Sequence, residues 1–435
     1  MPRAGTAKPG AAGLALDRTP RSWQIATVFA RPPLHRIASG WLIALVWTCG
    51  CGAKSELEVG RPRAPAGPMS DAATARDATA DAPRDPPTDA GPIVCSRARI
   101  AASVSLDDTT LSGVTPRVVA LPNGDTGVVY VSTDGDPTRV VWERVDASLA
   151  RLTGPVTVST ASFTWSEAVI REGEIFLAWG LAGDRSSILQ RIDADGHTID
   201  AARELPLHHP SVLSPSPNGL FWLAFAMRAD NALEMVHLAL DGSRLHDVVT
   251  VDLGRYGSGH GAIARAGSSS HIVGYPREGP PGVREGYVNA LTEAGELGPE
   301  RQLSEDGDHT VLPVQHGPSL VLVRVNDEAL VLERTDPTTL ERIDRVSFPS
   351  TGRGISPATL GDRLVIGHAQ SGTFFLDDFG PDLSAVERTT MSLPSPTTGS
   401  GQSVATFPGA VVFAFTLADG PRTHPWLVRV ECSTD

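Results

Sequence analysis

Lysine is almost missing from this chain. Of its 37 basic residues only Lys8 and Lys54 are lysines, and every basic residue after Lys54 is an arginine. The later chain therefore cannot form a Schiff base through lysine, attach pyridoxal phosphate or supply the lysine of a phosphate-binding P-loop. A GC-rich genome would produce the same bias without any functional cause.

Positive charge is also scarce where the folded domain is expected. The formal net charge is −13. Residues 95–435 hold 26 arginines and 42 acidic residues (−16), whereas residues 1–94 hold 11 basic and 8 acidic residues (+3). Nucleic-acid binding usually needs a basic face, so no nucleic-acid partner is expected. The two parts of the chain differ physically and are considered separately.

The sequence lacks the common catalytic and metal-binding motifs. There is no His-Glu-x-x-His, no Gly-x-Ser-x-Gly and no cysteine cluster. The segment 193–196 (Asp-Ala-Asp-Gly) is similar to part of a calcium loop but lacks the remaining ligands, which favours a turn. The glycine-rich segment 257–261 is not followed by a helical pattern, which favours a flexible loop between two blades over a phosphate site. We expect no metal and no cofactor.

An uncharged apolar segment lies near the N-terminus. Residues 37–47 (IASGWLIALVW) have the length of the hydrophobic region of a signal peptide and are short for a membrane span. Arg31 and Arg36 precede the segment, and Cys49 and Cys51 follow it. This order of charge, apolar run and cysteine is typical of a secretory targeting sequence.

A cysteine directly after an apolar stretch and a small residue resembles the lipobox of bacterial lipoproteins. In that family the cysteine is acylated and becomes the mature N-terminus. Gly50 before Cys51 favours Cys51 as the lipidated residue, and Cys49, with Val46 three residues earlier, is the alternative. The resemblance implies a lipoprotein-type signal peptide over residues 1–51 and attachment to the bacterial outer membrane or cell surface. The alternatives are a secreted or periplasmic protein and an uncleaved anchor.

Residues 52–94 are dominated by alanine, aspartate and proline and show no apolar periodicity. Such a segment cannot bury enough apolar surface to offset the entropy lost on ordering, so we predict a disordered linker. Its simplest role is a tether that holds the following domain away from a membrane. A tail that binds a partner is the alternative.

The remaining 341 residues repeat a pattern of about 47 residues. Each repeat has an alternating apolar segment, a turn glycine, a second apolar strand, a third strand and a more polar fourth strand. The turn glycines are Gly124, Gly173, Gly219, Gly267, Gly317, Gly361 and Gly409. The chain resembles seven-bladed β-propellers over residues 95–435, without the signature of any subfamily. We therefore predict an all-β fold of seven blades with four antiparallel strands each.

The two ends of the repeated region complement each other. The seventh repeat stops at Cys432 after its third strand, whereas Cys95–Leu106 reads as a fourth strand without its other three. We expect this N-terminal strand to complete the last blade and to place Cys95 beside Cys432. A secreted protein folds in an oxidising compartment, so a disulfide is expected. A redox-active pair is the alternative.

Ligands of propellers usually bind at one end of the central channel, beside the loops that lead into the innermost strands. Aromatic, histidine and arginine side chains in these loops would suit a carbohydrate or protein ligand. The candidates are Trp165, His209, Tyr256, His260, His309 and Arg353.

Three functions remain open for such a chain. The first is a non-catalytic, lipid-anchored envelope protein, monomeric, whose propeller is a binding or scaffolding module. The second is a carbohydrate-active enzyme, which would need paired carboxylates about 5–10 Å apart at the channel. The third is an accessory lipoprotein of an outer-membrane assembly complex.

Overall fold

A computed structural model of the 435-residue chain describes residues 93–433 with short gaps. The gaps are 107–112, 134–136, 161–162, 182–185, 209, 227–231, 254–261, 267–269, 279–283, 293, 305–309, 327–328, 350–353, 398–402 and 421. Backbone contacts divide the chain into residues 1–81 and 82–435, and all described residues belong to the second unit. The predicted signal peptide and almost all of the predicted linker lie outside the described residues.

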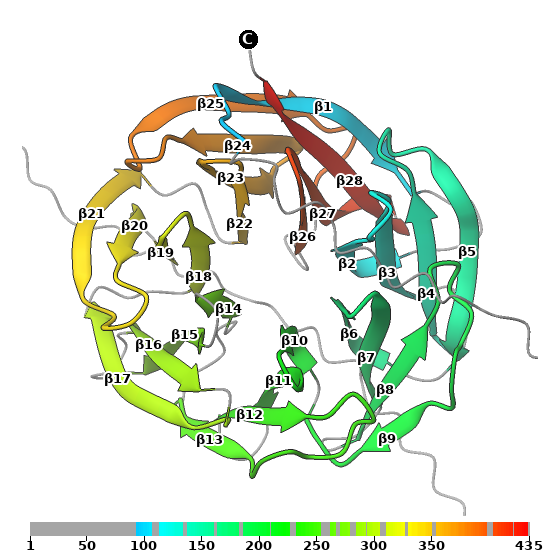
Figure 1. Ribbon diagram of the computed structural model, residues 1–435. Helices are drawn as coiled ribbons and strands as arrows, with labels where there is room; N and C mark the ends of the chain where they lie inside the picture. The colour runs from blue at the N-terminus through cyan, green and yellow to red at the C-terminus, as the bar shows by residue number, and fades with distance from the viewer. Residues whose placement is uncertain are drawn as a thin grey trace, which may run out of the picture. The chain divides into compact units, whose positions relative to one another are not determined.

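Seven four-stranded antiparallel sheets follow one another around a common axis (Figure 1). We number them as blades 1–7 in chain order. Blade 1 has β2 (Gly113–Ala120), β3 (Thr126–Ser132), β4 (Arg139–Val145) and β5 (Arg151–Thr160). Blade 2 has β6 (Phe163–Arg171), β7 (Glu174–Leu181), β8 (Ser187–Ile192) and β9 (Arg203–Leu205). Blade 3 has β10 (Pro210–Ser216), β11 (Gly219–Ala226), β12 (Ala232–Leu238) and β13 (Val249–Asp252).

The later blades repeat this order. Blade 4 has β14 (Ala262–Ala266), β15 (Ser270–Glu278), β16 (Arg284–Thr292) and β17 (Leu297–Ser304). Blade 5 has β18 (Thr310–His316), β19 (Ser319–Val325), β20 (Ala329–Thr335) and β21 (Arg342–Pro349). Blade 6 has β22 (Ile355–Leu360), β23 (Arg363–Gln370), β24 (Thr373–Phe379) and β25 (Ala385–Ser392). Blade 7 has β26 (Ser403–Phe407), β27 (Ala410–Asp419), β28 (Arg422–Ser433) and β1 (Arg97–Ser105). The predicted seven-bladed propeller is confirmed.

The N-terminal strand closes the ring as predicted. β1 pairs antiparallel with β28 (Figure 1). In this pairing Ala98 lies opposite Cys432. Cys95 and Cys432 form a disulfide with a Cα–Cα distance of 5.3 Å across 337 residues of sequence. First and last strands of the propeller are thus joined both by a ladder of hydrogen bonds and by a covalent bond.

Each junction between neighbouring blades is filled by its own cluster of buried apolar side chains. At the junction of blades 1 and 2, Trp142 of β4 packs with Leu177 and Trp179 of β7, and none of the three is more than 1% exposed. Equivalent clusters fill the other six junctions, including the one between blades 7 and 1. Burying one such side chain stabilises the fold by about 1.5–3 kcal/mol. Packing on both faces of every sheet therefore holds the ring together.

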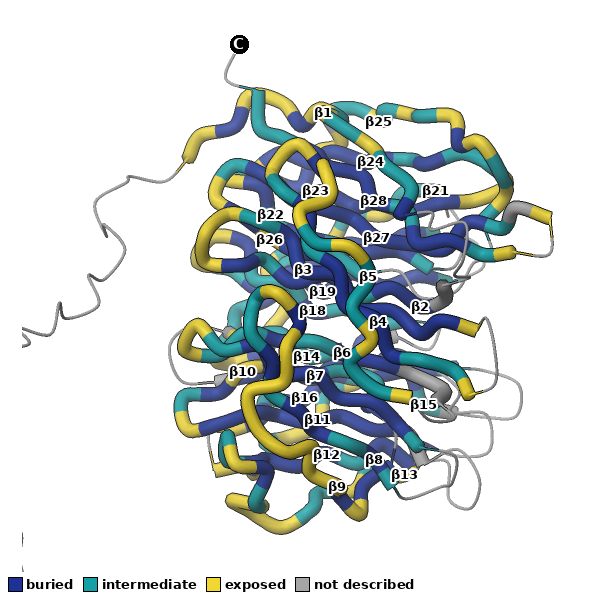
Figure 2. The backbone as a smooth tube through the Cα atoms, turned by 90° about the vertical axis from the view of Figure 1, so that its right-hand side faces the viewer, coloured by how far each residue is buried: buried dark blue, intermediate teal, exposed yellow. Residues whose placement is uncertain are grey.

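The exposure of residues to solvent increases from the second strand of a blade to the fourth. Six of the seven residues of β19 are buried, whereas β21 alternates between exposed and half-buried positions. Figure 2 shows the exposed residues gathered on turns and outer strands. Polar residues and proline suit an outer strand because its free edge faces water.

The turn glycines serve two different purposes. Five of the seven adopt a positive φ, as expected for a tight hairpin, and Gly267 lies outside the described residues. Gly219 is different: its φ is not positive, and a Cβ built there would lie 1.9 Å from the carbonyl oxygen of Leu238. Close approach of two backbones, rather than turn geometry, requires glycine at this position.

The turns between third and fourth strands are fixed by aspartate. In the segment 193–196, Asp193 Oδ1 accepts hydrogen bonds from the backbone N–H groups of Asp195 and His197, both at 2.9 Å. Asp146, Asp241 and others accept equivalent bonds in other blades. The carboxylate of the calcium-like segment is therefore used by the turn itself. Across the described parts of the chain we find no helix with the length and apolarity that crossing a bilayer requires.

Candidate functional site

The innermost strands all begin at one end of the ring, which we call the channel mouth. The predicted ligand residues belong to the sequence segments that lead into these strands. Trp165 lies in β6, but its side chain is outside the described part of the structure. His209, Tyr256, His260, His309 and Arg353 lie outside the described residues altogether. These six residues therefore remain predictions, and the site is built below from the described side chains around them.

The innermost strands of blades 1, 2 and 3 are each interrupted by a β-bulge close to the channel mouth. Their pairing with the next strand shifts register between Val114 and Arg117, between Phe163 and Ser166, and between Pro210 and Val212. The same pairing is continuous in blades 4 to 7 over the residues that are paired there. Bulges bend a strand and redirect its side chains, and they are frequent next to functional sites. The bulges thus distinguish three consecutive blades, and one of them contains Trp165.

Two buried hydroxyl groups beside these bulges find no hydrogen-bond partner among the described residues. They are Oγ1 of Thr115, a residue that is 7% exposed, and Oγ of Ser166, which is fully buried. Thr115 also has a φ of 52°, in the left-handed region that residues other than glycine seldom adopt. Unpaired buried polar atoms and backbone strain both cost free energy, and such features cluster at functional sites.

An ion pair joins the innermost strands of blades 1 and 2 directly after their bulges. Arg117 Nε donates to Glu167 Oε1 at 2.5 Å. Both side chains are largely buried, with 13% and 10% of their surface exposed. Burial raises the pKa of the Glu167 carboxyl, and the guanidinium of Arg117 offsets part of that rise. The pair places one guanidinium and one carboxylate midway along the innermost strands β2 and β6.

A histidine is fixed at the same end of blade 3. His208 lies in the link between β9 and β10, and its Nδ1 is 2.6 Å from Glu234 Oε2 on β12. The carbonyl oxygen of His208 accepts hydrogen bonds from Trp222 Nε1 at 3.2 Å and from Ser187 Oγ at 3.1 Å. Backbone and ring are therefore both held in place, directly before the predicted ligand residue His209.

The described side chains at this end of blades 1 to 3 thus include two separate pairs, Arg117 with Glu167 and His208 with Glu234, and two buried hydroxyl groups. Groups of this kind can donate and accept hydrogen bonds. Glu167 and Glu234 each have a basic partner, Arg117 and His208. Among the described residues, no group of three histidine, cysteine or acidic side chains is arranged to hold a metal ion.

The sequence analysis did not identify Arg117, Glu167 or His208 as site residues. Two of them could have been found from their neighbours, because Glu167 follows Trp165 by two residues and His208 directly precedes His209. The bulges themselves have no sequence signature, since they depend on the register between two strands.

A second polar cluster lies on the outer strands of blade 4. Tyr275 Oη lies 2.5 Å from Asn289 Oδ1 and 2.7 Å from Glu300 Oε2, and these two acceptors share its single proton. Tyr287 stacks on Tyr275 and donates to Glu285. Burial and the neighbouring carboxylates raise the pKa of both phenols, to about 12 for Tyr287. The neutral phenols act as hydrogen-bond donors that link β15, β16 and β17.

Comparisons with known proteins show the fold and no family. No family model and no curated protein matches the chain. The WD40 domain of coronin from Toxoplasma gondii is similar in structure, with 8% identity and a TM-score of 0.50, over 79% of this chain and 89% of that one. A Dyadobacter fermentans protein of unknown function has 10% identity and a TM-score of 0.49, over 77% and 99%. BamB from Moraxella catarrhalis has 12% identity and a TM-score of 0.41, over 77% and 100%. At these identities the likeness concerns the propeller fold alone.

Proposed function

We propose that this chain is a non-catalytic, lipid-anchored protein of a bacterial envelope, and that its propeller is a binding module. The observation that carries the binding role is the set of three consecutive bulges at the channel mouth, with the Arg117–Glu167 pair beside them. The ligand enters at this mouth and contacts blades 1 to 3. Trp165 provides an aromatic surface, and the guanidinium of Arg117 provides hydrogen-bond donors.

The proposed location is supported by the disulfide and by the N-terminal sequence. A bond between Cys95 and Cys432 persists in an oxidising compartment, such as the periplasm or the cell surface. The apolar segment 37–47 and the cysteines that follow it supply the export signal and the acylation site, and residues 52–94 supply the tether.

Lipidation is tested by metabolic labelling with a radioactive fatty acid. The full-length protein should incorporate the label, and Cys51→Ala should abolish incorporation, whereas Cys49→Ala should leave it unchanged. Loss of label in Cys49→Ala alone would move the acylation site to Cys49. A wild-type protein without label would show that the chain is not a lipoprotein.

Ligand binding is tested with a glycan array and with co-purification from envelope extract. The full chain should retain a glycan or an envelope protein, and the double variant Trp165→Ala, His260→Ala should lose it. Asn123→Ala, in the turn between β2 and β3 and so at the opposite end of the ring, serves as the matched control. Unchanged binding in the double variant would remove this mouth as the site. Release of reducing sugar from a retained glycan would replace the binding role by catalysis, and co-purification with an outer-membrane assembly complex would identify a scaffolding role.

A further inference from the structure

A hollow opens at the rim of blades 2 and 3 because their outer strands are short. β9 has three residues and β13 has four, whereas the outer strands of the other blades have eight to ten. Between β9 and the turn that follows β12 this leaves a hollow of about 260 Å³. Its size is below the roughly 300–1,000 Å³ of pockets that take a whole drug-sized molecule. It fits one or two side chains of a partner.

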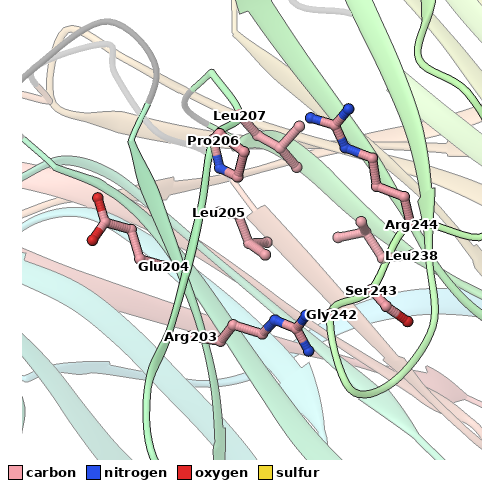
Figure 3. A pocket seen from close by; sticks show the side chains of 9 residues that line it. All are labelled: Arg203, Glu204, Leu205, Pro206, Leu207, Leu238, Gly242, Ser243 and Arg244. Carbon is pink, nitrogen blue, oxygen red and sulfur yellow. The ribbon is translucent and has the colours of Figure 1, made fainter.

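The hollow has an apolar floor between two guanidinium groups. Leu205, Leu207 and Leu238 form the floor and are at most 4% exposed. Arg203 lies at one end of the hollow and Arg244 at the other, with the leucine side chains between them (Figure 3). Glu204 also lines the rim, but its carboxylate points away from the hollow (Figure 3). This carboxylate accepts a hydrogen bond from Ser186 Oγ.

Both guanidinium groups retain capacity to bind an anion. Arg244 is exposed, and its guanidinium has no hydrogen bond or ion pair to another described residue. Arg203 donates through Nη1 to the carbonyl oxygen of Asp241, in the turn after β12. The side-chain carboxylate of Asp241 lies 3.8 Å from the same nitrogen. A guanidinium has five N–H donors, so others remain for a ligand. Two such groups beside apolar surface are unusual in a region that carries a net charge of −16.

We propose that this hollow is a docking site for an acidic peptide segment of a partner protein, in which an aliphatic side chain is flanked by carboxylates. The aliphatic side chain enters the hollow beside the exposed Pro206 and above Leu205, and the carboxylates pair with Arg203 and Arg244. Arginine pairs well with carboxylates because its planar guanidinium matches their geometry. The apolar floor adds a preference for an aliphatic side chain between the two carboxylates. None of the residues that line the hollow is among those assigned to the channel mouth, although Leu207 directly precedes His208. The docking proposal therefore does not depend on the ligand proposed for the mouth.

Fluorescence anisotropy with labelled pentapeptides tests this site on the full-length protein in detergent. The test peptide is Ala-Glu-Leu-Glu-Ala, and its controls are Ala-Glu-Ala-Glu-Ala and Ala-Lys-Leu-Lys-Ala. We expect only the first peptide to bind well, with an affinity that falls as salt screens the charges. Arg244→Glu should weaken binding at least about tenfold, since it replaces a charge-assisted hydrogen bond by repulsion.

The matched control is Arg342→Glu, which makes the same change of charge at an exposed arginine near the start of the outer strand of blade 5. It should bind like the wild type. Equal loss in both variants, binding of the lysine peptide, or no binding by the wild type would overturn the proposal. Analytical ultracentrifugation of the same samples tests whether a second copy of this chain occupies the hollow. A wild-type dimer that is lost in Arg244→Glu would show this and would overturn the peptide proposal.

Discussion

His368 shows how the burial of a single residue couples stability to pH. Its ring is 3% exposed, lies on β23 and stacks on Phe375 of β24 with a centroid distance of 4.7 Å. Burial lowers the pKa of His368 to about 4, because the charged imidazolium would lose its water, and Arg388 adds to this while Asp377 opposes it. Between the ordinary pKa of 6.5 and this lowered value, the unfolded chain binds more protons than the folded one. Stability from this residue is complete above pH 6.5 and falls as the pH falls towards 4.

We expect His368→Gln to remove this dependence. Between pH 7 and pH 4.5 the wild type should lose about 2 kcal/mol more stability than the variant. Urea unfolding of both proteins at the two pH values measures the difference. All other ionisable groups are the same in both proteins, so their contributions cancel in the comparison. Identical losses would show that His368 is protonated in the folded state at pH 4.5.

At the scale of the element, the N-terminal strand is held by two blades. β1 completes blade 7, but Asp378 of blade 6 accepts a hydrogen bond from the backbone N–H of Ala98 at 3.0 Å. Arg363, also in blade 6, donates to Asp378 at 2.6 Å and to the carbonyl oxygen of Ser96 at 3.2 Å. The Arg363 and Asp378 side chains are only 6% and 3% exposed. A buried ion pair therefore fixes the point at which the chain enters the ring.

Asp378→Ala should loosen β1, because it leaves the Arg363 charge buried without its partner. Loss of one member of a buried pair costs about 3–5 kcal/mol. Amide hydrogen exchange should accelerate along β1 before it does so in the other blades. Glu387→Ala is the control: it removes the exposed ion pair with Arg97 of the same strand and should cost less than about 1 kcal/mol. Equal effects of the two changes would contradict a special role for Asp378.

At the scale of the whole molecule, the disulfide joins the two ends of a closed ring. Because the bond spans 337 residues, it strongly limits the unfolded chain. Chain-entropy reasoning gives about 5–6 kcal/mol for a loop of this length. Cys432→Ser should lower the melting temperature by roughly 8 °C. A reductant should lower it by the same amount in the wild type and leave the variant unchanged, and a reductant effect on the variant would point to a different cause.

The sequence alone determined the number of blades and the way in which the ring closes. The number of blades follows from a local pattern that every repeat shows, the alternation of apolar residues and a turn glycine such as Gly124. The closure follows from a single strand before the first repeat and a last repeat that lacks its fourth strand. The pairing of Cys95 with Cys432 followed from that strand count. The positions of the bulges, the Arg117–Glu167 pair and the hollow beside Arg244 were decided only by the tertiary structure. These features depend on the register between strands and on contacts between blades, and residues about 50 positions apart meet there without any local signal.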